Sequence, residues 1–138
     1  MIKLSHFFKR KKNYLILDKY GIEFKLVKDS DQKYLNARQK STTDLNFFIC
    51  GFFVHLGIEI LQDILVDIEK AQNGAPFDED PYQSGLDIFL FIGASTSLFK
   101  STNAAAGTAT IPTQDIKEII EACIDWMVSN RFEKLLWL

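Results

Sequence analysis

The chain has 138 residues, a length that fits a single domain and is sufficient to bury a hydrophobic core. Its 47% hydrophobic and 25% charged residues are typical of an ordinary globular protein, which excludes wholesale disorder. The net charge of -2 conceals an asymmetry, because residues 1–40 hold 11 of the 16 Lys and Arg but 4 of the 18 Asp and Glu. Residues 1–40 therefore carry a net charge of +7 and residues 41–138 a net charge of -9. We predict one domain over 1–138.

The N-terminal third begins with a basic segment, residues 1–12, which is expected to be a flexible arm. No long apolar stretch follows it, so it does not resemble a secretory signal. Tyr14–Leu17 and Ile22–Val27 are predicted to be two strands, the second because apolar and charged side chains alternate along it. A turn at Gly21 would join them as a hairpin. The polar stretch Lys28–Thr43 is predicted to be a loop.

The strongest periodic signal in the chain lies in its centre. Apolar side chains from Leu45 to Ile68 recur at steps of mostly three and one residues, which is the spacing of one helix face. This pattern predicts a long helix over 44–72. Two glycines weaken its first half, since each costs up to about 1 kcal/mol relative to alanine. A strand over 47–54, followed by a helix from about Leu56, is the alternative.

The C-terminal half alternates loops and short apolar segments. An exposed acidic loop is predicted at 75–85, followed by a central strand covered on both faces at 86–92. Two short strands are predicted at 97–100 and 108–111, and a helix at 113–128. Together with 14–27, these strands would make one sheet. The predicted fold class is therefore α+β, with a small antiparallel sheet packed against a long central helix and a C-terminal helix.

The sequence also bears on the cellular environment. The most apolar window, Phe47–Leu61, is shorter than the ~18–20 residues that span a membrane, so no membrane span is expected. Cys50 and Cys123 both lie in apolar periodic segments, and two thiols do not make a disulfide framework. We interpret them as buried residues of a cytoplasmic protein.

No catalytic, metal-binding or cofactor-binding pattern stands out. His6 and His55 are far apart and neither has a partner at ligand spacing. Ser95 and Ser97 follow a glycine but lack the glycine after the nucleophile that a hydrolase turn requires. The sequence therefore predicts no enzyme, no cofactor and no metal site.

Acidic side chains cluster in the second half of the central helix and in the loop that follows it. Asp63 and Asp67 are four residues apart and share one helix face, as either an acid–base pair or, as we favour, a solvated face. A continuous negative surface would attract a basic partner and speed its association. The predicted partner-binding residues are Asp63, Asp67, Glu69, Asp78, Glu79 and Asp80.

Two segments of this region resemble a known class of proteins. Ile60–Ala71 ends near Gly74 and is followed by the acidic loop, an apolar strand and a short hairpin, and then by Ile111–Glu121 with Trp126. Over about residues 58–128 this order of elements resembles the immunity proteins of bacterial contact-dependent growth-inhibition and related polymorphic toxin systems. The resemblance implies a cytoplasmic, non-enzymatic protein. Such a protein binds the toxic domain of an incoming effector, often a nuclease, and blocks its active site.

The leading hypothesis is therefore an inhibitor that neutralises a cognate toxin domain through its acidic surface. Two alternatives belong to other classes. A nucleic-acid-associated regulator would use the basic run Lys9, Arg10, Lys11 and Lys12, although the negative net charge makes nucleic acid the less favoured partner. A structural or oligomerisation subunit would form a homodimer through its apolar tail, Leu135, Leu136, Trp137 and Leu138.

Overall fold

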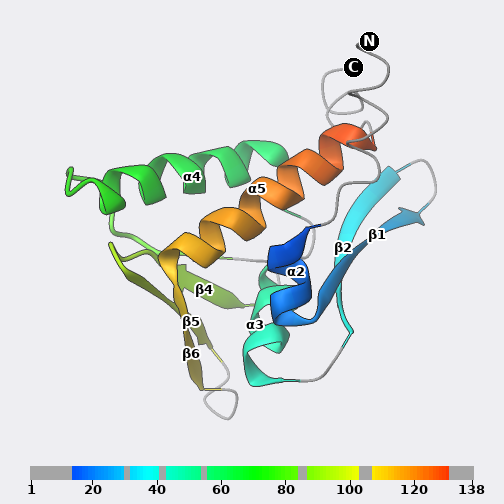
Figure 1. Cartoon of the computed structure of the whole chain (residues 1–138), viewed down its shortest axis with the longest axis horizontal. Helices are drawn as coiled ribbons and strands as arrows, with labels where there is room; N and C mark the ends of the chain where they lie inside the picture. Colours follow the sequence, from blue (N-terminus) through cyan, green and yellow to red (C-terminus); the bar gives the residue numbers. More distant parts are fainter. Residues whose placement is uncertain are drawn as a thin grey trace.

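The computed structural model describes residues 14–29, 32–40, 43–53, 56–83, 87–102 and 107–130. The chain combines helices with antiparallel sheets, so the predicted α+β class is confirmed (Figure 1). The elements are α2 (Leu15–Tyr20), β1 (Ile22–Asp29), β2 (Gln32–Gln39), α3 (Asp44–Phe52), α4 (Ile58–Gln72), β3 (Tyr82–Gln83), β4 (Ile88–Phe91), β5 (Thr96–Ser101), β6 (Thr108–Pro112) and α5 (Thr113–Ser129).

The larger sheet is an antiparallel meander in the order β3-β4-β5-β6. Three of its strands, β4, β5 and β6, match predicted segments, and the short β3 falls inside the predicted loop. β4 is an interior strand, with Leu90 opposite Phe99 on β5. The prediction that both faces are covered was only partly right. Ile88 and Leu90 are buried on one face, whereas the alternate side chains Phe89 and Phe91 are only half-buried.

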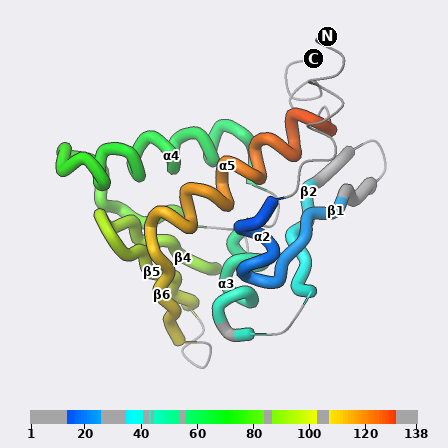
Figure 2. Tube along the Cα trace, viewed as in Figure 1, coloured from blue at the N-terminus to red at the C-terminus, as the bar shows by residue number. Residues whose placement is uncertain are grey.

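The predicted single sheet was wrong, because β1 and β2 form a separate two-stranded sheet. Residues 28–43 were expected to be a loop, but β2 pairs with β1 over its full length, from Ile22 opposite Gln39 to Asp29 opposite Gln32. Among residues 35–39 of β2, whose side chains are described, Leu35 and Ala37 are buried on one face, whereas Arg38 on the other face is exposed to solvent. α3 contacts both β2 and the larger sheet, so it lies between the two sheets (Figure 2).

The predicted strand at 14–17 is also wrong, since these residues begin helix α2. Gly21 does not close a hairpin; it ends this helix in the left-handed conformation, at φ 64°. Its N–H donates to the carbonyl oxygens of Leu17 and Asp18. Three consecutive apolar residues at 15–17 satisfy either a short strand or a helix turn, and contacts with α5 select the helix.

The predicted long helix is two helices. α3 ends at Phe52 and α4 begins at Ile58, so neither the continuous helix nor the alternative strand over 47–54 is correct. The predicted start of a helix near Leu56 is close to the observed one. The apolar spacing continues across the break because both helices bury one face. α3 packs its face on the larger sheet, whereas α4 packs against α5.

The core joins these layers around Phe99 of β5. Its ring stacks on that of Phe48, with centroids 6.2 Å apart, and lies 5.7 Å from that of Phe52. A buried polar turn then connects the sheet to α5. The Thr113 hydroxyl donates to the Gly93 carbonyl at 2.6 Å and lies 2.8 Å from the Ser97 hydroxyl. α5 runs from Thr113 to Ser129, one residue beyond the predicted 113–128.

Several predictions concern residues that the structure does not describe. The basic arm 1–12, the tail Leu135–Leu138 and both histidines, His6 and His55, lie outside the described residues. Cys50 and Cys123 are both described, and both are buried and unpaired as predicted. Burial raises the pKa of the Cys50 thiol to about 11. Across the described ranges, no helix is both long and apolar enough to cross a membrane.

Candidate functional site

The predicted acidic residues lie on α4 and on the chain that follows it. α4 buries one face, with Ile64 and Ile68 fully inaccessible, which turns the opposite face toward solvent. Asp63 is exposed on that face, and Asp67 lies one turn later and is half-buried. The four-residue spacing separates them by only about 40° around the helix axis. The predicted sharing of one helix face is thus present.

Tyr82 of β3 brings the helix and the acidic loop together. Its hydroxyl donates to Asp67 Oδ2 at 2.5 Å, across 15 residues of sequence. Burial raises the pKa of Tyr82 well above its usual range, and the hydrogen bond to Asp67 and the charges of Asp67, Asp63 and Asp78 raise it further. Of the six predicted carboxylates, Asp67 contacts this hydroxyl directly, and Asp63 and Asp78 act on it through their charges. Tyr82 was not among the predicted partner-binding residues, because it lies in the segment that was predicted to be a loop.

The other three predicted residues do not join this cluster. Glu69 is two residues beyond Asp67, which places it about 160° away around the axis of α4, at the opposite margin of the exposed face. Glu79 and Asp80 are exposed in the loop. The backbone N–H of Asp80 donates to Asp78 Oδ1 at 3.0 Å, a local turn that fixes the Asp78 carboxylate.

The negative charge of this region is not neutralised locally. Residues 58–81 contain seven acidic residues and one lysine, Lys70, a net charge of -6. Within the described part of the chain, none of these seven carboxylates forms an ion pair. We call the set Asp63, Asp67, Glu69, Asp78, Glu79 and Asp80 the acidic surface. The negative electrostatic potential of this surface would attract a basic partner.

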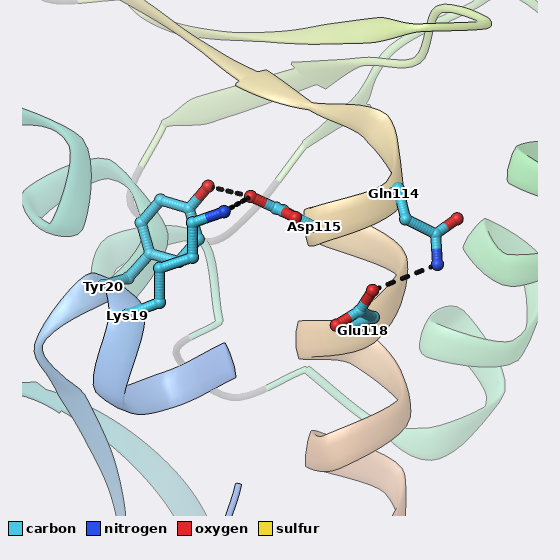
Figure 3. A network of polar contacts seen from close by, with 5 residues as sticks. All are labelled: Lys19, Tyr20, Gln114, Asp115 and Glu118. Carbon is cyan, nitrogen blue, oxygen red and sulfur yellow. Dashed lines mark hydrogen bonds and ion pairs between the residues drawn. The ribbon is translucent and has the colours of Figure 1, made fainter. Parts of the chain in front are cut away.

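A second polar site, which the sequence analysis did not identify, lies at the start of α5 (Figure 3). Asp115 is buried, and its Oδ2 accepts hydrogen bonds from Lys19 Nζ at 2.8 Å and from the Tyr20 hydroxyl. On the other side of α5, Gln114 donates to Glu118 at 3.1 Å and accepts from Gln72 of α4 at 3.0 Å. The first turns of α5 thus connect α2 and α4.

The protonation states at Asp115 follow from its partners. Burial alone would raise the pKa of the Asp115 carboxyl, but hydrogen bonds from Lys19 and Tyr20 and the Lys19 charge outweigh it, so the pKa is lowered. Burial and the bond to Asp115 raise the pKa of Tyr20 well above its usual range. The Asp115 carboxylate is therefore ionised and accepts bonds at Oδ2 from a cation and a neutral phenol, an arrangement that connects α2 to α5.

The serines considered as nucleophiles and the glycine before them have structural roles or surroundings of their own. Ser97 is buried, and its hydroxyl contacts Thr113 in the turn before α5, whereas Ser95 is exposed. Gly93 is required there, because a Cβ would lie 2.3 Å from the Thr96 carbonyl oxygen. No group of three or more His, Cys, Asp or Glu side chains in the described ranges is placed to hold a metal ion.

Comparison with known proteins does not add to this description. A scan against protein-family models finds no match, and neither does a search of curated proteins or of solved structures. The resemblance to immunity proteins therefore stays a prediction from the order of elements.

The tyrosine–carboxylate bonds predict an unusual alkaline titration. Tyr14 donates to Asp125 at 2.8 Å, and burial together with this bond raises its pKa in the same way as those of Tyr20 and Tyr82. Three of the four tyrosines should therefore remain neutral above pH ~10, where unfolded tyrosines ionise. Ultraviolet absorbance of tyrosinate, measured against pH, checks this.

The same shifts give the sign of the stability change. A tyrosine whose pKa is higher in the folded than in the unfolded protein stabilises the fold fully at pH values below its unfolded pKa. This contribution to the free energy of unfolding is lost as the pH rises through its folded pKa. The urea midpoint should fall above pH ~10. The fall should be smaller in Tyr20→Phe and Tyr82→Phe than in the wild type. A midpoint that stays constant in this range would contradict the assignment.

Proposed function

We propose that the protein is a non-enzymatic inhibitor that binds a basic toxin domain, such as that of a nuclease, through the acidic surface. The observation that carries this proposal is the concentration of negative charge on α4 and the loop after it, where Tyr82 bonds Asp67 and none of the carboxylates forms an ion pair among the described residues. A nuclease needs a positive surface to hold phosphates, so such an acidic surface complements it.

The side chains beside the carboxylates also suit a protein partner. Ile60 and Val66 of α4 remain 42% and 50% exposed. Protein–protein interfaces combine an apolar centre with a charged rim, and the charges mainly set association rate and specificity. α4 therefore offers both kinds of contact on one helix.

The basic alternative receives less support from the described residues. Lys19, Lys25 and Lys40 each pair with a carboxylate, of Asp115, Glu23 and Asp18 respectively. Paired lysines release less counterion on binding a phosphate backbone. The run Lys9–Lys12 lies outside the described residues, so this alternative stays a prediction.

Neutralising the acidic surface should weaken the complex. The partner to test first is the protein encoded by the neighbouring open reading frame, because immunity and toxin genes are adjacent in the systems that this chain resembles. Changing all six residues to Asn or Gln should lower affinity at least about tenfold, mainly through a slower association rate with weaker salt dependence. Surface plasmon resonance at several salt concentrations measures both quantities.

A matched control separates the surface from net charge. Glu118→Gln, Glu121→Gln and Asp18→Asn remove three exposed charges elsewhere, and they are compared with Asp63→Asn, Asp67→Asn and Asp78→Asn. Only the second triple variant should weaken binding strongly. Equal affinity of the wild type and the six-residue variant would reject the acidic surface as the contact. Failure of the neighbouring protein to bind the wild type would reject that partner.

A further inference from the structure

The larger sheet ends in an open edge at strand β6. In the order β3-β4-β5-β6, β6 pairs with β5 on one side, and no described strand lies on its other side. The opposite edge of the sheet is β3, which has two residues, whereas β6 has five. An edge strand presents backbone N–H and C=O groups with which another strand can pair. β6 is therefore the place at which this sheet can accept a further strand.

The hydrogen bonds at the two ends of β6 show which of its backbone groups point outward. The Gly107 carbonyl accepts from an N–H of β5 at 3.2 Å, and the Thr113 N–H donates to the Ser95 carbonyl at 2.9 Å. In an antiparallel pair, every second residue of a strand turns both its N–H and its C=O toward the same neighbour. The odd-numbered residues of β6 therefore bond to β5. The N–H and C=O groups of Thr108 and Thr110 point away from it.

The side chains of β6 leave this edge accessible. Thr108 and Thr110 are exposed, and none of the five residues is charged. Natural sheets often protect an edge with a lysine, a proline or a bulge. The register with β5 is continuous, so β6 has no bulge, and its proline, Pro112, is the last residue of the strand. The missing N–H of Pro112 limits the length of a pairing strand and does not prevent the pairing.

We propose that β6 pairs antiparallel with β6 of a second copy of this chain, which joins the two larger sheets into one. In a two-fold arrangement that places Thr108 opposite Thr110 of the second copy, both outward N–H groups of each copy donate to carbonyls of the other. The threonine side chains then form cross-strand pairs. Lys100 lies opposite Thr108 on β5, so it falls in the same row as Leu98 of the second copy, and like charges do not face each other.

The edge of β6 is thus complementary to itself in hydrogen bonding, in side chains and in charge. A pairing of two short strands is a small contact, so the dimer is expected to be weak, with a dissociation constant of about 0.1 mM. The interface lies on the sheet, whereas the acidic surface lies on α4 and the loop after it. The inference therefore does not depend on the proposed function.

Concentration-dependent measurements on the full-length wild-type protein test this dimer. Sedimentation should detect a species of twice the 15.8 kDa of the chain as the concentration rises. The amides of Thr108 and Thr110 should exchange with solvent about fivefold more slowly near 1 mM protein than at high dilution, because pairing protects them. The amides of Ala109 and Ile111, which bond to β5, should be protected at both concentrations. A monomer at every concentration, or exchange of Thr108 and Thr110 that ignores concentration, would refute the dimer.

Three variants test whether the edge itself forms the contact. Thr110→Pro removes an outward N–H while leaving the bonds to β5, so it should abolish the dimer. Thr110→Val is the matched control, because it keeps the N–H and the shape and should dimerise as the wild type does. Thr108→Lys combined with Thr110→Lys keeps every backbone group but places like charges opposite each other, so it should also be monomeric.

The lysine variant makes the test independent of whether the proline variant folds, which circular dichroism shows. A dimer that persists in the folded lysine variant would overturn the proposal. So would a dimer that is lost on deletion of residues 132–138 and kept in Thr110→Pro, because the contact would then be the apolar tail.

Discussion

Replacing Phe99 by alanine is expected to lower the free energy of unfolding by about 3 to 5 kcal/mol. Phe99 is fully buried in β5, and its ring contacts those of Phe48 and Phe52 on α3. Truncation loses the transfer free energy of the ring. It also leaves a cavity that the neighbouring rings can fill only in part, since they are fixed on another element. Urea unfolding followed by circular dichroism measures the change.

Phe47→Ala is the matched control for this substitution. Phe47 lies on α3 beside Phe48, but it is 52% exposed. Its truncation should cost much less, about 1 kcal/mol or below. If the two variants lost similar stability, the joint between β5 and α3 would not be the centre of the core.

Changing Asp115 to asparagine is expected to lower the free energy of unfolding by about 1 to 2 kcal/mol at neutral pH. Asparagine keeps the shape and one acceptor oxygen, so the variant removes mainly the charge that Lys19 and Tyr20 face. The loss of stability is expected to be moderate, because the Lys19 side chain is 59% exposed and its ammonium group is hydrated in the variant. Glu121→Gln, an exposed change on the same helix, should be nearly neutral.

The effect of Asp115 should depend on pH in a defined direction. The pKa of Asp115 is lowered in the folded protein. Its contribution to the free energy of unfolding is therefore complete above the ordinary aspartate pKa of about 3.9, and it is lost as the pH falls through the folded-state pKa. The stability difference between the wild type and Asp115→Asn should therefore shrink in acid. A difference that is constant from neutral pH to well below pH ~4 would show that the carboxylate charge is not responsible.

Some candidate-site residues were accessible to sequence reasoning and others were not. Asp63 and Asp67 share a face because four residues make about one helical turn, a local relation that periodicity reveals. Tyr82 was missed because a two-residue strand has no periodic signal, and its position near Asp67 depends on the path of the loop. Asp115 was not selected from the sequence. Its partners Lys19 and Tyr20 are 96 and 95 residues away in sequence.

The errors in the fold have a related cause. β2 is polar in sequence, with Leu35 and Ala37 as the buried apolar side chains among its described positions, so its strand character comes from pairing with β1. The break between α3 and α4 is hidden because each helix continues the same apolar spacing on its own axis. Tertiary contacts decide which of two locally acceptable conformations such a segment adopts.

The sequence by itself determined α5, the strands β4 to β6 and the carboxylates along α4. Each of these follows from side-chain spacing within one segment, because burial of one face imposes a period of 3.6 or 2 residues. Only the tertiary structure decided that residues 15–20 form a helix, that the sheet is divided, and that three tyrosines each bind a carboxylate on a helix. These features depend on contacts between distant parts of the chain. The charge asymmetry between the two parts of the sequence likewise became a located surface only when α4, β3 and the loop between them were placed together.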